Sequence, residues 1–287
     1  MSGPIVVIGD VMVDVVVRLS GPIAAGSDTP AEIVQRGGGA AANVAAWLAR
    51  SGAAAILVGR VGDDARGRAV VTALRDEGVD VRVAVDPQRP TGTCVVLVAP
   101  DGERSMLPDR GANAALAPTP LTADAAHVHV AGYALLDPGA RPAALAALAA
   151  AREAGIPTSV DPASAAPLAA ARGAFLGWID GVDLLLPNAD EATVLTGAAD
   201  PVEAAQVLSE SAREVVVTLG GAGALWTDGT ALVRVPAVPT DVVDTTGAGD
   251  AFTAGVLAAR VAGAGPRNAL EAGAALAAQA VARPGAR

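Results

Sequence analysis

Hydrophobic residues occur in short continuous runs that alternate with longer, alanine-rich stretches of helical character. The runs are rich in β-branched residues, as is typical of strands buried on both faces of a sheet. They span residues 4–9, 54–58, 127–130, 157–160, 182–186 and 214–219. The helical stretches include residues 40–51, 66–77, 142–154 and 201–212. This alternation predicts βαβ crossovers and an α/β fold with a doubly wound, mainly parallel sheet flanked by helices.

Two segments, residues 11–36 and 79–108, break this alternation. Both contain β-branched runs and turn signals without a helical period, which predicts a small inserted sheet of antiparallel strands that acts as a lid. The main domain would then comprise residues 1–10, 37–78 and 109–287. Between Val11 and Val17 both faces of the first lid strand are largely apolar, so each face should be covered. We expect the main domain and its ligand on one face and a second copy, forming a homodimer, on the other.

The composition excludes several functions. The 287 residues carry 20 basic side chains, all arginine, and 30 acidic ones, giving a net charge of −10. Without lysine there is no Walker A loop and no Schiff-base chemistry. Without a basic cluster, nucleic acid and anionic membranes are unfavourable partners. One cysteine and two histidines do not suffice for a disulfide framework or a thiolate zinc site. No signal peptide or membrane span is evident, so we expect a soluble, cytoplasmic protein.

The strongest chemical signal is the string from Asp241 to Phe252, DVVDTTGAGDAF, which precedes an amphipathic run. The small residues Gly247, Ala248 and Gly249 would leave backbone amides free at a helix N-terminus, where the helix dipole favours an anion. Asp250 would lie in the first helical turn, placed to act as a base for an attacking hydroxyl. The structural alternative is a tight turn in which Asp250 merely caps the helix.

A second glycine-rich segment covers residues 37–45, GGGAAANVA. Gly38 and Gly39 would let a polyhydroxylated ligand approach the backbone, and Asn43 could bridge loop and ligand. The segment also satisfies G-x-G-x-x-A, so an NAD-dependent oxidoreductase is an alternative from another class. A dinucleotide loop should follow the first strand directly, however, and this one comes far downstream of it.

Together the two motifs resemble the signatures of the ribokinase family, the PfkB-type carbohydrate kinases. The resemblance covers nearly the whole chain and implies an ATP-dependent kinase that transfers the γ-phosphoryl group to a hydroxyl of a sugar or sugar-like acceptor. Asp250 would be the catalytic base and the amides of Gly247, Ala248 and Gly249 the anion hole. The acceptor would be held by Asp14, Gly38, Gly39, Asn43 and Arg104, and Arg110 is a further arginine near the lid.

The same resemblance extends to the nucleotide and metal ions. Asn188 and Glu191 match the family's Asn-x-x-Glu motif, in which the glutamate organises Mg²⁺ through water, although the pair also reads as a helix capping box. Asp244 and Thr246 match positions that bind K⁺ in some members, but the short final segment, residues 281–287, argues against K⁺ activation. The nucleotide-binding loop would comprise Thr218, Gly220, Gly221 and Gly223.

The acceptor itself is not specified by these motifs. A nucleoside kinase of the adenosine or pseudouridine type is the alternative within the family, and a non-catalytic sugar-binding regulator is the alternative outside it. The scarcity of aromatic side chains, which would stack on a base, favours a sugar. His127 and His129 alternate along a strand and are interpreted as structural, and Cys94 as a small buried hydrophobe.

Overall fold

The main body is built on one large sheet. The computed structural model describes residues 3–287, and nine strands form this sheet in the order β13-β12-β11-β10-β9-β8-β1-β4-β5. All neighbouring strands are parallel except for the pairs β11–β12 and β12–β13. The strands are β1 (Ile5–Ile8), β4 (Ala55–Gly62), β5 (Asp80–Asp86), β8 (His127–Ala131), β9 (Thr158–Asp161), β10 (Val182–Leu185), β11 (Ala212–Thr218), β12 (Ala224–Thr227) and β13 (Leu232–Val235).

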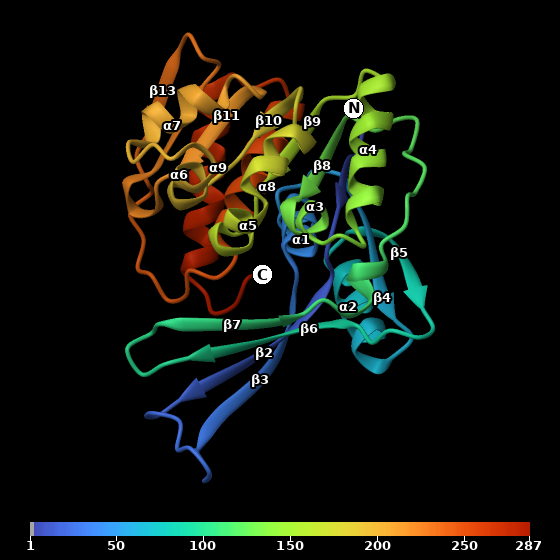
Figure 1. The fold of residues 1–287 in the computed structure, drawn as a ribbon, viewed down its shortest axis with the longest axis vertical. Coiled ribbons are helices and arrows are strands. Elements are labelled where there is room, and N and C mark those ends of the chain that lie inside the picture. Colours follow the sequence, from blue (N-terminus) through green and yellow to red (C-terminus); the bar gives the residue numbers. More distant parts are fainter. Residues whose placement is uncertain (1–2) are drawn as a thin grey trace.

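Helices cover both faces of this sheet, as Figure 1 shows. They are α1 (Ala40–Arg50), α2 (Ala65–Asp76), α3 (Gly132–Leu136), α4 (Arg141–Glu153), α5 (Ala165–Trp178), α6 (Ala189–Thr196), α7 (Pro201–Leu208), α8 (Ala248–Val261) and α9 (Pro266–Val281), with short 3₁₀ turns at Gly111–Ala115 and Gly220–Ala222. Alternate residues of β1 enter different cores. Ile5 and Val7 pack with α1, α2, α8 and α9, whereas Val6 and Ile8 pack with α4 to α7. The prediction of a doubly wound α/β fold is confirmed.

A smaller, separate sheet lies beside the main body, with strand order β3-β2-β6-β7. Its strands are β2 (Met12–Leu19), β3 (Ala31–Gly38), β6 (Gly92–Val98) and β7 (Arg104–Asp109). Figure 1 shows it extending away from the helices at the edge where the C-terminus lies. We call these four strands the small sheet. The expected antiparallel pairing is present between β2 and β3 and between β6 and β7, but β2 and β6 run parallel. β1 leads directly into β2.

The predicted lid segments need two further corrections. β5 lies within the predicted segment 79–108 but belongs to the main sheet, where it pairs in parallel with β4 after the α2 crossover. β3 continues through Gly37 and Gly38, beyond the predicted boundary at residue 36. Within residues 3–287, no helix is long and apolar enough to cross a membrane.

The two histidines lie inside the main sheet layer. Nε2 of His127 and Nδ1 of His129 each lie 2.8 Å from the hydroxyl oxygen of Ser159 on the neighbouring strand. Burial lowers the pKa of His127 to about 4 and that of His129 to about 3. Both side chains are therefore neutral structural groups, as interpreted from the sequence.

Candidate active site

The start of α8 forms the anion-binding element. Gly247 precedes the helix in the left-handed conformation, with φ of 75°, and a Cβ there would lie 2.5 Å from the carbonyl oxygen of Ala286. The N–H groups of Gly247, Gly249 and Asp250 have no protein acceptor among residues 3–287, whereas that of Ala248 donates to the Thr245 carbonyl at 3.3 Å. The free amide donors therefore differ from the predicted set, the amides of residues 247–249. Gly247 and Gly249 offer free donors, Asp250 adds one, and Ala248 is already engaged.

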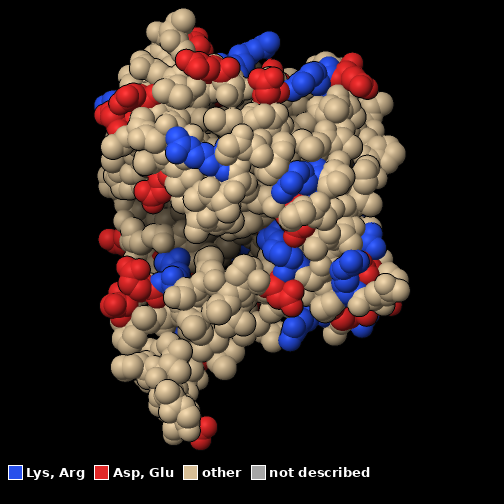
Figure 2. All heavy atoms as spheres, in the orientation of Figure 1, with Lys and Arg blue, Asp and Glu red and all other residues tan. Residues whose placement is uncertain are grey.

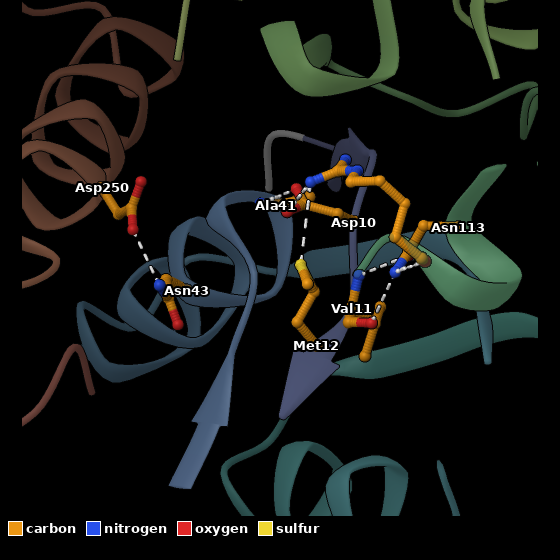
Figure 3. Close-up of polar contacts among 8 residues, drawn as sticks. Asp10, Val11, Met12, Ala41, Asn43, Asn113 and Asp250 are labelled. Carbon is orange, nitrogen blue, oxygen red and sulfur yellow. Dashed lines mark hydrogen bonds and ion pairs between the residues drawn. The ribbon is translucent and has the colours of Figure 1, made fainter. Parts of the chain in front are cut away.

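Asp250 projects from the first turn of α8 towards α1. Its Oδ2 accepts a hydrogen bond of 2.8 Å from Nδ2 of Asn43, so the structure brings together two residues from opposite ends of the chain (Figure 3). Burial raises the pKa of Asp250 well above its usual value, and the Asn43 hydrogen bond opposes this rise. Such a carboxyl group is suited to accepting a proton from a hydroxyl.

The glycine pair before α1 lets the Asp14 carboxylate lie directly over the backbone. A Cβ on Gly38 would be 2.3 Å from Oδ1 of Asp14, and Gly39 has φ of 95°. Asp14 is on β2, an interior strand of the small sheet, so it does not occupy an edge strand. Burial raises its pKa to about 6, with a further rise from the charge of Asp10 and an opposing effect of Arg287.

The side chains of Asp10 and Asn113 connect the start of α1 and the 3₁₀ turn at Gly111–Ala115 with the segment between β1 and β2 (Figure 3). The Asn113 side chain accepts from the Val11 amide at 2.9 Å and donates to the Val11 carbonyl at 3.0 Å. Oδ1 of Asp10 accepts from the Ala41 amide at 3.4 Å, and Oδ2 lies 3.5 Å from Nη1 of Arg110. This buried network fixes where α1, and with it Asn43, lies relative to the small sheet.

A polar pocket of about 140 Å³ opens beside the anion-binding element. It is lined by Ala40, Asp161, Ala163, Leu186, Asn188, Glu191, Thr218, Gly247, Gly249, Asp250 and Thr253. Asn188 and Glu191 form a complete capping box at the start of α6, with Asn188 Oδ1 accepting from the Glu191 amide at 2.9 Å. Burial, reinforced by the charge of Asp161, raises the pKa of Glu191 to about 8. The capping box is therefore present, and the same two residues line the polar pocket.

A larger, mainly apolar pocket of about 470 Å³ adjoins the polar one and shares Thr218 and Gly249 with it. Gly220, Gly221 and Gly223 form one wall. The rest of the lining includes the aromatic ring of Phe252 and the aliphatic side chains of Val238, Val242, Ala274, Ala277, Ala278 and Val281. All four residues assigned to the nucleotide loop therefore line this pocket.

Arg104 links the small sheet to the loop before α8. Its guanidinium donates to the hydroxyls of Thr245 and Thr246 and lies 3.1 Å from Oδ1 of Asp244. Burial alone would raise the pKa of Asp244, but hydrogen bonds from Thr246 and Gly285 and the charge of Arg104 together lower it. Asp244 and Thr246, the two positions considered for K⁺, are thus both in contact with the Arg104 guanidinium.

The segment after α9 contributes contacts that the sequence did not suggest. The indole N–H of Trp47 donates to the Ala286 carbonyl at 2.9 Å, and Arg36 donates to the Pro284 carbonyl at 2.6 Å. The Arg287 guanidinium packs against Gly37, where a Cβ would lie 1.9 Å from its Nη2. These contacts close the space between β3, α1 and the start of α8.

Asp161 is another site residue that sequence reasoning missed. It ends β9, and burial raises its pKa to about 6. A usable signal was present, because an aspartate directly after a buried parallel strand lies at the carboxyl edge of the sheet, where α/β folds bind ligands. Within residues 3–287 no group of three or more His, Cys, Asp or Glu side chains is arranged to hold a metal ion directly.

Comparison with known proteins agrees with this geometry. The family model of the pfkB family carbohydrate kinases matches residues 3–287. A ribokinase from Arabidopsis thaliana is 32% identical over 276 residues, covering 91% of this chain and 71% of its own. The crystal structure of adenosine kinase from Sinorhizobium meliloti superposes with a TM-score of 0.91 at 28% identity, covering 100% of this chain and 96% of that one.

A ribokinase structure from the same plant, complexed with ribose and ATP, has a TM-score of 0.84 at 29% identity and covers 100% of this chain and 95% of its own. These likenesses extend over both the main body and the small sheet, and they exclude the dinucleotide-binding oxidoreductase considered from Gly37 and Gly39. The chain therefore belongs to the pfkB family of carbohydrate kinases, phosphotransferases that act on a hydroxyl group.

Proposed function

We propose that this protein transfers the γ-phosphoryl group of ATP to a hydroxyl of a small sugar or sugar-like acceptor. The observation that carries the proposal is that two adjoining pockets connect a site for a nucleotide base with the anion-binding element and Asp250. The apolar pocket suits an adenine base, it shares Thr218 and Gly249 with the polar pocket, and the free amides and Asp250 line that polar pocket. A nucleotide lying along this path would present its terminal phosphate to the amides, next to the Asp250 carboxylate.

In this mechanism Asp250 accepts the proton of the attacking hydroxyl as the new phosphorus–oxygen bond forms, and the bond from the γ-phosphorus to the bridging oxygen breaks so that ADP leaves. The amides of Gly247 and Gly249, joined by that of Asp250, stabilise the negative charge on the transferring group. Asn43 orients the Asp250 carboxylate, and Asp14 accepts hydrogen bonds from acceptor hydroxyls at the cradle made by Gly38 and Gly39. The small sheet acts as a lid that keeps water, a competing acceptor, away from the phosphate.

The polar pocket suits Mg²⁺ bound together with phosphates. Asp161, Glu191 and Asp250 place carboxyl groups with raised pKa values in one pocket, and none of its lining residues in 3–287 is an arginine. Mg²⁺ is typically held by one or two carboxylates, water and substrate phosphates. Glu191 and Asp161 would hold the ion through water, and the ion would neutralise charge on the phosphates.

The residues proposed for K⁺ do not suit that ion. Oδ1 of Asp244 accepts from the Thr246 amide at 2.9 Å and faces Arg104, and Oδ2 accepts from the Gly285 amide at 3.0 Å. A second cation would therefore meet a guanidinium at short range. We propose that Arg104 takes the role of the monovalent ion here.

The experiment is to measure ADP release by the purified protein with ATP and Mg²⁺ across pentoses, hexoses, sugar acids, sugar phosphates and nucleosides, with Asp250→Asn as the blank. Acceptor-dependent ADP above that blank supports the proposal and identifies the acceptor class. Turnover with adenosine or pseudouridine but with no sugar would favour the nucleoside kinase instead. No ADP release from any acceptor, in a protein shown to bind ATP, would contradict the proposed activity.

We further propose that the outer face of the small sheet pairs with a second copy of the chain. Val15 and Val17 lie on this face, and its apolar side chains Ile33 and Leu107 are 62% and 54% exposed. A contiguous exposed apolar face of this kind marks an interaction surface. Sedimentation should give a dimer that Ile33→Glu dissociates, and a monomer at all concentrations would contradict the proposal.

A further inference from the structure

A pocket of about 130 Å³ continues the acceptor site along the inner face of the small sheet. It is lined by Asp14, Val16, Arg18, Arg36, Val96, Val98, Gly102, Arg104, Val243, Asp244, Thr246, Gly285 and Ala286. Asp14 lies on the glycine cradle, and Thr246 directly precedes the anion-binding element. A ligand whose hydroxyl reaches Asp250 would therefore extend into this pocket. Figure 2 shows the surface hollowed where the small sheet, in the lower part of the view, meets the main body.

The register of the small sheet brings three arginines to this pocket. Arg36 on β3 is directly opposite Asp14 on β2. Arg18 and Arg104 flank Val98 in a single row across β2, β6 and β7, so their side chains share the inner face. In a chain with a net charge of −10, three of the 20 basic residues thus gather around one small pocket.

Three carboxylates face these three arginines: Asp14, Glu32 and Asp244. Arg104 is paired with Asp244 at 3.1 Å. Arg36 makes a hydrogen bond to a backbone carbonyl only, and Arg18 makes neither a hydrogen bond nor an ion pair with any other residue in 3–287. Of the two carboxylates in the pocket, Asp14 faces the acceptor cradle. Glu32 is directly opposite Arg18 but does not line the pocket, and neither Arg18 nor Arg36 forms an ion pair within residues 3–287.

We propose that the natural acceptor carries an anionic group, a carboxylate or a phosphate monoester, in addition to the hydroxyl that is phosphorylated. Arg18 and Arg36 bind this group at the far end of the pocket, while Asp14 and Asp250 bind hydroxyls at the near end. Guanidinium groups match the geometry of both anions through paired, charge-assisted hydrogen bonds. This inference rests on the proposed kinase activity and narrows its substrate class.

The test is calorimetric titration of matched compounds into the Asp250→Asn protein, which separates binding from turnover. One series compares fructose with fructose 1-phosphate and fructose 6-phosphate, and the other compares glucose with gluconate and 2-keto-3-deoxygluconate. The two series distinguish a phosphate from a carboxylate. We expect the tightest ligand to be anionic and to bind at least about tenfold more tightly than its neutral counterpart, as charge-assisted hydrogen bonds to arginine imply.

Arg18→Gln is the diagnostic variant, because within residues 3–287 this exposed side chain forms no hydrogen bond or ion pair whose loss would disturb the fold. It should remove most of the preference for the anionic compound over its neutral counterpart. The matched control is Arg75→Gln, which removes the same charge from the exposed surface of α2, outside the pocket. The control should keep the preference unchanged.

The outcomes separate this inference from the proposed function. The anionic acceptor would be overturned if the anionic compounds bind no more tightly than their neutral counterparts, or if none of them binds measurably. It would also be overturned if Arg18→Gln weakens the binding of anionic and neutral compounds equally. ADP release by the wild-type protein with neutral acceptors alone would overturn it as well, while leaving the kinase in place. An anion preference that depends on Arg18, without ADP release from any compound, would instead overturn the kinase assignment and keep the anion site.

Discussion

The pairing of Asp250 with Asn43 sets the conditions under which the base can work. A general base must be ionised, so activity should rise with pH through the pKa of Asp250, which burial holds well above its usual value. Asp250→Asn should lower kcat by about 10²-fold or more while leaving acceptor binding intact. Near-normal turnover by this variant in the ADP-release assay would remove Asp250 from the mechanism.

Asn43→Ala tests the positioning of that base. The Asn43 hydrogen bond lowers the pKa of Asp250, so its loss should move the acid limb of the pH–rate profile to higher pH. A merely structural role would lower the melting temperature without moving that limb. Profiles of kcat/KM against pH for both proteins decide between the two.

The two glycines of the anion-binding element should respond differently to the same substitution. Gly249→Val adds side-chain atoms where, apart from its own helix, no atom of residues 3–287 lies within 4 Å of the new Cβ. It should therefore fill the phosphate site and abolish turnover with little loss of stability. Gly247→Val forces a β-branched residue into φ of 75° and against Ala286, so it should also lower the melting temperature. Similar melting temperatures for the two variants would contradict this assignment.

At the scale of elements, the sequence predicted the parts whose signals are local. The strand runs at residues 4–9 and 127–130, and the helix after Gly39, appear where the periodicity placed them. The sequence did not reveal that β5 belongs to the main sheet, because its alternating residues resemble those of the small sheet. Parallel pairing of β2 with β6 was equally hidden, since it depends on contacts between segments far apart in the chain.

The candidate site shows the same division. Asp250, Asn43 and the 247–249 turn were found because their motifs are contiguous. Asp161 and Arg287 were missed because their roles come only from the folded geometry, one at a strand end and the other against Gly37.

The contact between β7 and the loop before α8 leads to a prediction about salts. Because Arg104 already places a cation beside Asp244 and Thr246, the wild-type rate should be the same in KCl, NaCl and a bulky organic buffer salt. Arg104→Gln removes that charge, so it should lower kcat/KM and make the rate respond to K⁺. Arg104→Lys, which keeps the charge without the fork of donors, should be intermediate. A wild-type enzyme that requires K⁺ would contradict the proposed role of Arg104.

At the scale of the whole molecule, the buried histidines of the main sheet make the folded protein less stable at acid pH. Their pKa values are lowered in the folded state, so the unfolded chain binds more protons below pH 6.5 and folding stability falls as pH decreases. Asp14, Asp161 and Glu191, with raised pKa values, contribute in the opposite sense and lose stabilisation as pH rises.

His129→Leu isolates the histidine contribution from the carboxyl groups. Denaturant unfolding at pH 7 and pH 5 should show that the wild type loses more of its free energy of unfolding than the variant does. An equal loss in both proteins would mean that His129 does not titrate on unfolding. The comparison within each protein cancels any constant effect of the substitution on packing.

The hydrogen bond from Trp47 to the Ala286 carbonyl makes the fluorescence of this tryptophan useful. Trp47 lies one helical turn after Asn43, with the guanidinium groups of Arg50 and Arg283 at 5.0 and 5.5 Å from its ring. The chain's other two tryptophans, Trp178 and Trp226, contact Arg141 and Glu214 instead. With those two changed to phenylalanine, the emission of Trp47 becomes an intrinsic fluorescent reporter of how the acceptor side of the molecule rearranges when a ligand arrives, readable in stopped flow without any label.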